Sequence, residues 1–348
     1  MAAVFRVIRA AAVVVFVLAL APGRARAQTA LQTELARAAG VRPENRWKGS
    51  LFEGATYVGT GTFYTSGHHN PYASLALYLR PTYDLGTKVA LTLNARLYVE
   101  AEMTQPDNPN ARHLYLYDPW FWLSAGNLHT FERSKIRIGG IARVILPLSP
   151  ESRYQHMLFG AGGGVNFNRV FEFGDVGDPD RKWTLLLTYA FTSYKYVQTS
   201  IYRGAAPGDA GGCRAPGTAH AGGAPSDQCG GPHNPNFSLN NGFIVSLSHG
   251  KWSAGVTLLI TNTFNYRFPD DPLSAAAATP TGRTDTTWGI VSLSRQISDR
   301  FSLVAGLSSL QPALDSRYRS PRFPFFDLSG GANANNYTQV YFALDGVL

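Results

Sequence analysis

The feature that most constrains this chain is a strict alternation of apolar and polar side chains from Val89 to Met103. A period of two is that of a β-strand, because successive side chains of a strand point to opposite faces. These 15 residues exceed the five or six that are usual in a soluble strand. A tilted strand that crosses a bilayer needs about 9–11 residues. The segment therefore predicts a membrane-spanning strand.

The same pattern recurs along the chain and predicts about twelve strands. For the aromatic strand, the face that holds Trp120 and Trp122 stays open, and the first strand is interrupted by glycine. The expected strands are Thr56–Tyr64, Leu75–Asp84, Val89–Met103, Pro119–Leu128, Ile136–Leu146, Met157–Asn168, Trp183–Thr192, Phe243–Leu247, Ala254–Phe264, Trp288–Ile297, Phe301–Ser309 and Tyr337–Leu348.

The connections between these strands differ systematically in length. Counted from the first strand, most odd connections are long and most even ones are short turns such as Leu85–Thr87 and Ser298–Arg300. This asymmetry is typical of an outer-membrane barrel. The alternative is a soluble all-β sandwich or barrel with one face in a core. From Ala55 to Leu348 the chain resembles the bacterial outer-membrane β-barrel superfamily, which implies an antiparallel up-and-down barrel with an even strand number and both termini in the periplasm.

The first residues predict export. Arg6 and Arg9 precede an apolar run of 12 residues, Ala10–Ala21, and Ala25-Arg26-Ala27 forms a signal-peptidase pattern. The run is too short for a membrane-spanning helix. We expect a cleaved signal peptide at residues 1–27, a periplasmic segment at 28–50 with a short helix over Thr29–Gly40, and an outer-membrane β-barrel at 51–348.

Charge gives little support to a nucleic-acid role. Without the four arginines of residues 1–27, the chain has 27 basic and 23 acidic residues, a net charge of +4, and no Lys/Arg-rich block. The whole chain is 45% hydrophobic and only 16% charged, which suits a barrel that faces lipid on one side.

The polar parity of the strands predicts a polar lumen, because an arginine facing lipid at mid-bilayer costs about 2–4 kcal/mol. We expect the charged side chains of this lumen to form a selectivity surface. The alternative is a salt-bridge network that fills a narrow barrel. The expected lumen-lining residues are Arg80, Asn94, Arg96, Tyr98, Glu100, Glu102, Arg137, Arg143, Asn166 and Asn168.

Gly160, Gly162 and Gly164 share this inward parity. We expect this row to leave room for a plug or ligand; the alternatives are a bulky neighbour or a curved wall. A phosphate cradle is disfavoured, since no helix pattern follows.

The longest connection contains both cysteines. In an exported chain, Cys213 and Cys229 are expected to form a disulfide. A metal site with His220 and His233 is the less favoured alternative, because the spacing does not match structural zinc sites. We expect no metal and no cofactor.

Three functions are compatible with these features. The favoured one is a channel or uptake protein for a small solute in the outer membrane. The second is a lipid-modifying hydrolase, for which His156 beside Ser149 and Ser152 is the candidate catalytic residue. The third is a structural or surface-recognition barrel that acts through the loop of Cys213 and Cys229.

The C-terminal strand is expected to face lipid with Val340, Phe342, Leu344 and Leu348. The resemblance implies that the barrel-assembly machinery reads such a strand and that it pairs with the first strand. The other expected partners are outer-membrane lipid and lipopolysaccharide.

Overall fold

The computed structural model describes residues 46–47, 49–63, 71–87, 89–104, 114–174, 181–201, 234–266, 283–314, 320–326 and 336–347. The predicted signal peptide, the N-terminal helix, Cys213, Cys229 and Leu348 lie outside these residues. Among the described residues, no helix has the length and hydropathy needed to cross a membrane.

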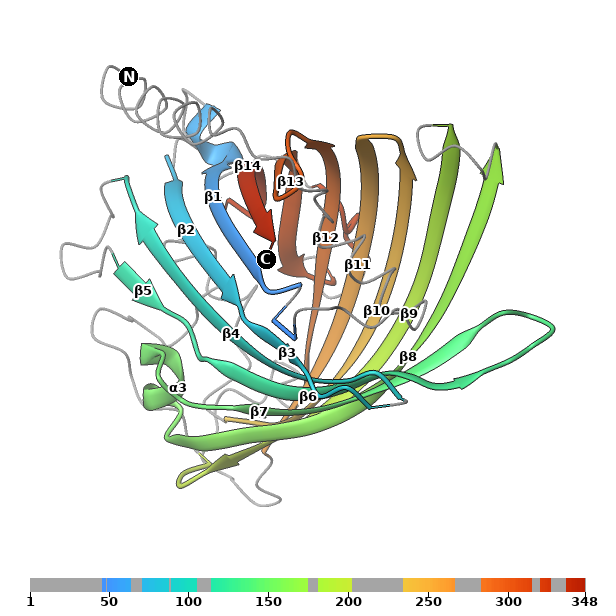
Figure 1. The fold of residues 1–348 in the computed structure, drawn as a ribbon. Coiled ribbons are helices and arrows are strands. Elements are labelled where there is room, and N and C mark those ends of the chain that lie inside the picture. The colour runs from blue at the N-terminus through green and yellow to red at the C-terminus, as the bar shows by residue number, and fades with distance from the viewer. Residues whose placement is uncertain are drawn as a thin grey trace.

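The described chain is almost entirely β-structure, arranged as one antiparallel sheet in which strands follow one another in chain order (Figure 1). Two short elements accompany the sheet: the 3-10 turn η1 (Thr60–Phe63) and the helix α3 (Pro150–Tyr154). The strands are β1 (Leu51–Gly59), β2 (Ala73–Arg80), β3 (Thr82–Asp84), β4 (Leu91–Glu102), β5 (Leu114–Leu116), β6 (Trp120–Thr130), β7 (Arg137–Ile145), β8 (Met157–Gly174), β9 (Lys182–Gln198), β10 (Pro235–His249), β11 (Trp252–Asn265), β12 (Arg283–Gln296), β13 (Phe301–Pro312) and β14 (Thr338–Val347).

The sheet closes on itself. β1 pairs with β14 along its whole length, from Leu51↔Val347 to Gly59↔Gln339, and β2 also pairs with β4. β2 and β3 are one strand interrupted at Pro81, and β5 and β6 together pair along β4. The fourteen assigned strands therefore form a closed barrel of twelve, as the sequence predicted.

Burial is inverted relative to a soluble protein. The large exposed side chains are mainly apolar, for example Phe342 at 60% and Leu293 at 51% exposure. The buried set is rich in polar groups, among them Ser74, Ser238 and Ser302. On each strand the two sets alternate, so one parity faces outward and the other faces the lumen. The barrel is polar inside and apolar outside, which excludes the soluble alternative on energetic grounds.

The two ends of the barrel differ. Short connections join β10 to β11 and β12 to β13 at one end, which we call the turn end; β1 begins and β14 ends there. Much longer connections join β9 to β10, β11 to β12 and β13 to β14 at the other, the loop end. All twelve predicted strands occur in the predicted order, although β8, β9 and β10 extend well beyond the segments with clear alternation.

The glycine row on β8 has a different role from the one that the sequence favoured. A Cβ at Gly162 or Gly164 would collide with the backbone of β9, at the carbonyl oxygens of Ser193 and Phe191. The Tyr194 ring also occupies the space above Gly162. These glycines therefore allow β8 and β9 to approach closely and a bulky neighbour to fill the gap, which was the alternative interpretation.

Candidate functional site: the charged wall of the lumen

The most concentrated set of charged and aromatic side chains lies on the inward face of β4, β6 and β7. Trp120 of β6 is contacted by two cations: the guanidinium carbon of Arg96 lies 4.3 Å from its ring centroid, and that of Arg143 lies 4.4 Å away. Register explains the arrangement, because β6 lies between β4, which carries Arg96, and β7, which carries Arg143. Such contacts are favourable by about 0.5–2 kcal/mol, more when they are desolvated.

Further aromatic rings enclose both guanidinium groups. Arg96 also lies over Tyr78 at 5.7 Å and Tyr98 at 5.5 Å. Arg143 lies over Trp122 at 5.3 Å and Tyr194 at 5.4 Å. Trp120 and Trp122, whose orientation the sequence left open, therefore belong to the arginine-bearing face.

Glu100 is buried on the same face of β4, towards the loop end. Tyr117 donates a hydrogen bond of 2.8 Å to its Oε2, and Tyr72 donates to its Oε1. Tyr98 packs against Tyr117 with ring centroids 4.7 Å apart. Two hydroxyl donors thus hold this carboxylate in place. Glu102, also buried, accepts a hydrogen bond of 2.9 Å from Thr104.

A second pair of acids lies at the closing seam. Glu53 of β1 and Asp345 of β14 are directly opposite one another in the register and share the inward face. Arg80, at the end of β2, acts electrostatically on both carboxylates. Directly opposed like charges are unfavourable in a sheet, and the neighbouring cation offsets part of that cost.

The remaining predicted lumen residues lie in smaller polar contacts. Buried Asn94 accepts from Thr82 at 2.9 Å and donates to Thr92 at 3.0 Å. Asn168 accepts a bond of 2.7 Å from Thr188. The side chain of Asn166 fills the space that a Cβ at Gly139 would occupy. Arg137 of β7 lies opposite Asn168 of β8 in the strand register.

The opposite wall is different in character. By strand order, β12 lies six strands from β6 around the barrel. The inward residues of β10, β11 and β12 that the structure describes are uncharged, mainly serine, threonine and asparagine. Trp288 is inward on β12 yet 39% exposed, and its Nε1 donates to Ser308 at 2.9 Å. Solvent therefore reaches the lumen beside this wall.

The candidate hydrolase residues lie in and beside helix α3, between β7 and β8: Ser149, Ser152 and His156. Ser152 is buried and donates to Asp118, and Ser149 caps α3 by accepting from the Ser152 amide at 3.2 Å. His156 is exposed, with a positive φ of 53°, and among the described contacts its side chain bonds neither serine. This geometry assembles no Ser–His pair. In the part of the chain that the structure describes, no group of His, Cys, Asp or Glu is placed to hold a metal ion.

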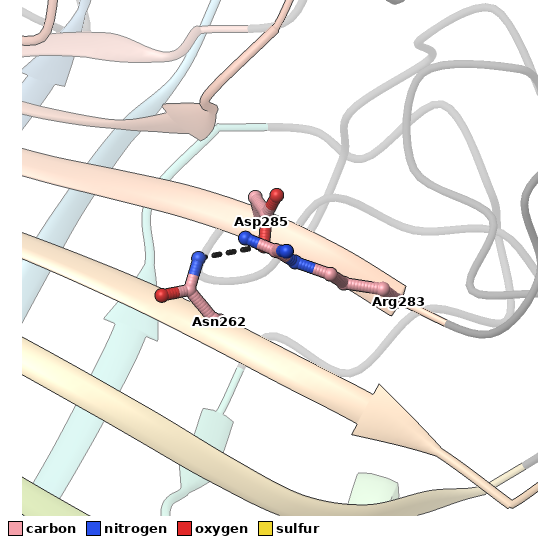
Figure 2. Close-up of polar contacts among 3 residues, drawn as sticks. All are labelled: Asn262, Arg283 and Asp285. Atoms are coloured by element: carbon pink, nitrogen blue, oxygen red, sulfur yellow. Dashed lines mark hydrogen bonds and ion pairs between the residues drawn. The ribbon is translucent and has the colours of Figure 1, made fainter.

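The outer face becomes polar at the loop end. Arg283 and Asp285 of β12 form an ion pair of 2.7 Å, and Asn262 of β11 donates to Asp285 at 2.7 Å (Figure 2). These side chains have the outward parity of Val291 and Val256. They mark the end of the apolar band near this rim.

Sequence reasoning did not assign four inward residues: Glu53 and Asp345 at the seam, and Trp120 and Tyr194 beside the arginines. Glu53 has the parity of Tyr57, and Asp345 has the parity of Tyr341, so alternation predicts that both acids face inward. Only the register of the seam places them opposite each other. Trp120 lies in the run Trp-Phe-Trp-Leu, where both parities are apolar and the pattern carries no direction.

No protein-family model matches the chain, and no curated protein matches its sequence. Solved structures that resemble this chain include the following three, each at most 12% identical to it. An outer membrane channel from Pseudomonas putida F1 is 12% identical, with 88% of this chain and 100% of that chain covered and a TM-score of 0.46. BamA from Haemophilus ducreyi lacking POTRA domains 1–3 is 12% identical, with 88% and 71% covered and a TM-score of 0.33. The transport unit of the autotransporter AIDA-I from Escherichia coli is 9% identical, with 91% and 95% covered and a TM-score of 0.33.

The chain's own geometry supports its fold class independently of these similarities. Its twelve antiparallel strands close through β1 and β14, its outside is apolar, and its inside is polar. This is the architecture of the outer-membrane β-barrel superfamily, as the sequence predicted.

Proposed function

We propose that this protein is an outer-membrane channel that passes or binds a small solute through its polar lumen. The observation that carries the proposal is the inverted burial of the barrel: polar side chains occupy the inner parity, and exposed apolar side chains occupy the outer one. Closed barrels are the only β-architecture that satisfies every backbone group within a bilayer. A twelve-strand barrel is wider than the eight-strand barrels that side chains just fill.

The distribution of exposure inside the barrel supports passage on one side. The wall of β2, β4, β6 and β7 is filled by large charged and aromatic groups. The wall of β10–β12 has small uncharged side chains and the exposed Trp288. A solute path would therefore run beside β10–β12 and face the arginine cluster across the lumen.

The test is conductance in planar lipid bilayers. We expect discrete current steps from the purified protein. Thr257→Trp adds bulk on the inward face of β11 and should lower the unit conductance by about half or more. Val256→Trp is its matched control, because Val256 is outward and 38% exposed. Absence of any current from correctly folded protein, or equal effects of the two substitutions, would contradict the channel proposal.

A further inference from the structure

The two guanidinium groups that share Trp120 are held in a fixed arrangement. Arg96 and Arg143 approach the indole from strands on either side of β6, at 4.3 and 4.4 Å from its centroid. A guanidinium that stacks on an aromatic ring has its face covered, while its N–H groups still point outward in its own plane. The site thus presents two oriented donor edges.

These donors are incompletely satisfied. The Nε atoms of Arg96 and Arg143 are both buried and have no hydrogen-bond acceptor within the described part of the chain. Neither side chain forms an ion pair with another described residue. A buried donor on a charged group without an acceptor is costly. An oxyanion would supply the missing acceptors with short, charge-assisted hydrogen bonds, and a planar guanidinium can make two of them in parallel.

The nearby acids do not neutralise the pair. The main electrostatic neighbours of Arg143 are Tyr194, which also accepts a hydrogen bond from its guanidinium, Arg96, which is a second cation, and Tyr78. Both Glu100 oxygens are engaged by tyrosine hydroxyls. Glu53 interacts with Arg96 but also with Arg80, and it lies opposite Asp345 at the seam. The facing wall of β10–β12 adds no inward charge among its described residues. Arg96 and Arg143 are therefore two neighbouring cations for which the described residues supply no ion-pair partner.

From this arrangement we propose that the Arg96–Trp120–Arg143 cluster is a binding site for a small oxyanion, a solute that carries a carboxylate or phosphate group. The anion accepts hydrogen bonds from both guanidinium edges, and Trp120 positions those edges. The inference rests on the proposed channel function and deepens it, because it assigns the chemical class of the solute.

The test uses three probes of similar shape on the purified full-length barrel in detergent: benzoate, phenyl phosphate and the neutral benzamide. Isothermal titration calorimetry should show saturable binding of one or both anions and at least about tenfold weaker binding of benzamide. Which anion binds more tightly distinguishes a carboxylate site from a phosphate site.

Substitutions at the cluster should remove this binding. Arg143→Gln and Arg96→Gln are each expected to weaken anion binding about tenfold or more. Arg143→Lys keeps the charge but not the planar fork, so we expect an intermediate affinity. The matched control is Arg295→Gln, since Arg295 also stacks on a tryptophan, Trp252 at 5.2 Å, but from the outward face of β12. Folding of each variant is checked by circular dichroism.

Equal binding of benzamide and benzoate would overturn the inference without any variant. So would unchanged affinity in Arg143→Gln, or an equal loss in Arg295→Gln. The two proposals fail separately. Arginine-dependent anion binding without conductance would reject the channel and retain the site, whereas conductance without anion binding would reject the site and retain the channel.

Discussion

At the scale of single residues, the barrel depends on where side chains are absent as much as on where they are present. Gly162 and Gly164 have no space for a methyl group, because the backbone of β9 lies against them. Gly242 has the same inward parity on β10, but its nearest neighbour would be 3.7 Å from an added Cβ. The same residue type is therefore required at one position and replaceable at another.

Gly162→Ala should lower the free energy of unfolding by about 1–3 kcal/mol, because the added methyl group forces β8 and β9 apart. Gly242→Ala is the matched control and should have little effect, since its surroundings accept a methyl group at ordinary contact distance. Urea unfolding followed by tryptophan fluorescence measures both. Equal stability of the two variants would show that the close approach of β8 and β9 is not required.

At the scale of elements, strand parity decides which substitutions the membrane tolerates. Val291 is outward near the middle of β12 and 40% exposed.

Farther along β12, towards the loop end, the outward-facing side chains are covered by another segment of the chain. Gly289 faces the backbone of Pro324 and Phe325, and the Gln311 side chain of β13 donates to the Phe323 carbonyl. The segment at residues 323–325 therefore packs on the outer wall, a contact between the connection and the barrel that alternation could not predict.

Val291→Arg should destabilise the membrane-inserted barrel by about 2–4 kcal/mol, because a cation on the lipid face near mid-bilayer loses its hydration. Val291→Leu, which keeps the apolar surface, should be close to neutral. Equilibrium unfolding in lipid vesicles compares them. A stability loss below about 0.5 kcal/mol for the arginine variant would contradict the assignment of this face to lipid.

At the scale of the whole molecule, closure brings Glu53 and Asp345 together from strands near opposite ends of the chain. Asp345 Oδ1 is buried, with no hydrogen-bond partner in the described structure. In contrast, Asp285 has Arg283 at 2.7 Å and Asn262 as a donor. Closure of the barrel therefore places Asp345 next to a like charge, which is unfavourable. Asp285 is instead stabilised by Arg283 and Asn262.

Asp345→Asn should raise the free energy of unfolding by about 0.2–1 kcal/mol, because it removes the repulsion between directly opposed carboxylates. Asp285→Asn should instead leave stability unchanged or lower it by up to about 1 kcal/mol, since it removes a partly exposed ion pair. Both are measured by urea unfolding at neutral pH. A clear loss of stability in Asp345→Asn would show that attraction to Arg80 outweighs repulsion from Glu53.

The sequence was sufficient for the class of fold. Alternation over Val89–Met103 predicted β4, and the same period predicted the other barrel strands, because a lipid-facing parity and a polar parity must separate on every membrane-spanning strand. Pattern reasoning was weaker where both parities are apolar, as around Trp120, and where side chains are missing, as at Gly162. The expected roles of Cys213, Cys229 and Leu348 remain predictions, since these residues lie outside the described structure.

By itself, then, the sequence predicted about twelve strands, their order and the inward parity of several charged side chains, since these depend on local periodicity. Only the tertiary structure decided which of those side chains meet. The pairing of β4, β6 and β7 places Arg96 and Arg143 against one indole, and the β1–β14 seam sets two acids opposite each other. Such contacts depend on the register between strands, and register follows from closure of the whole barrel rather than from any one segment.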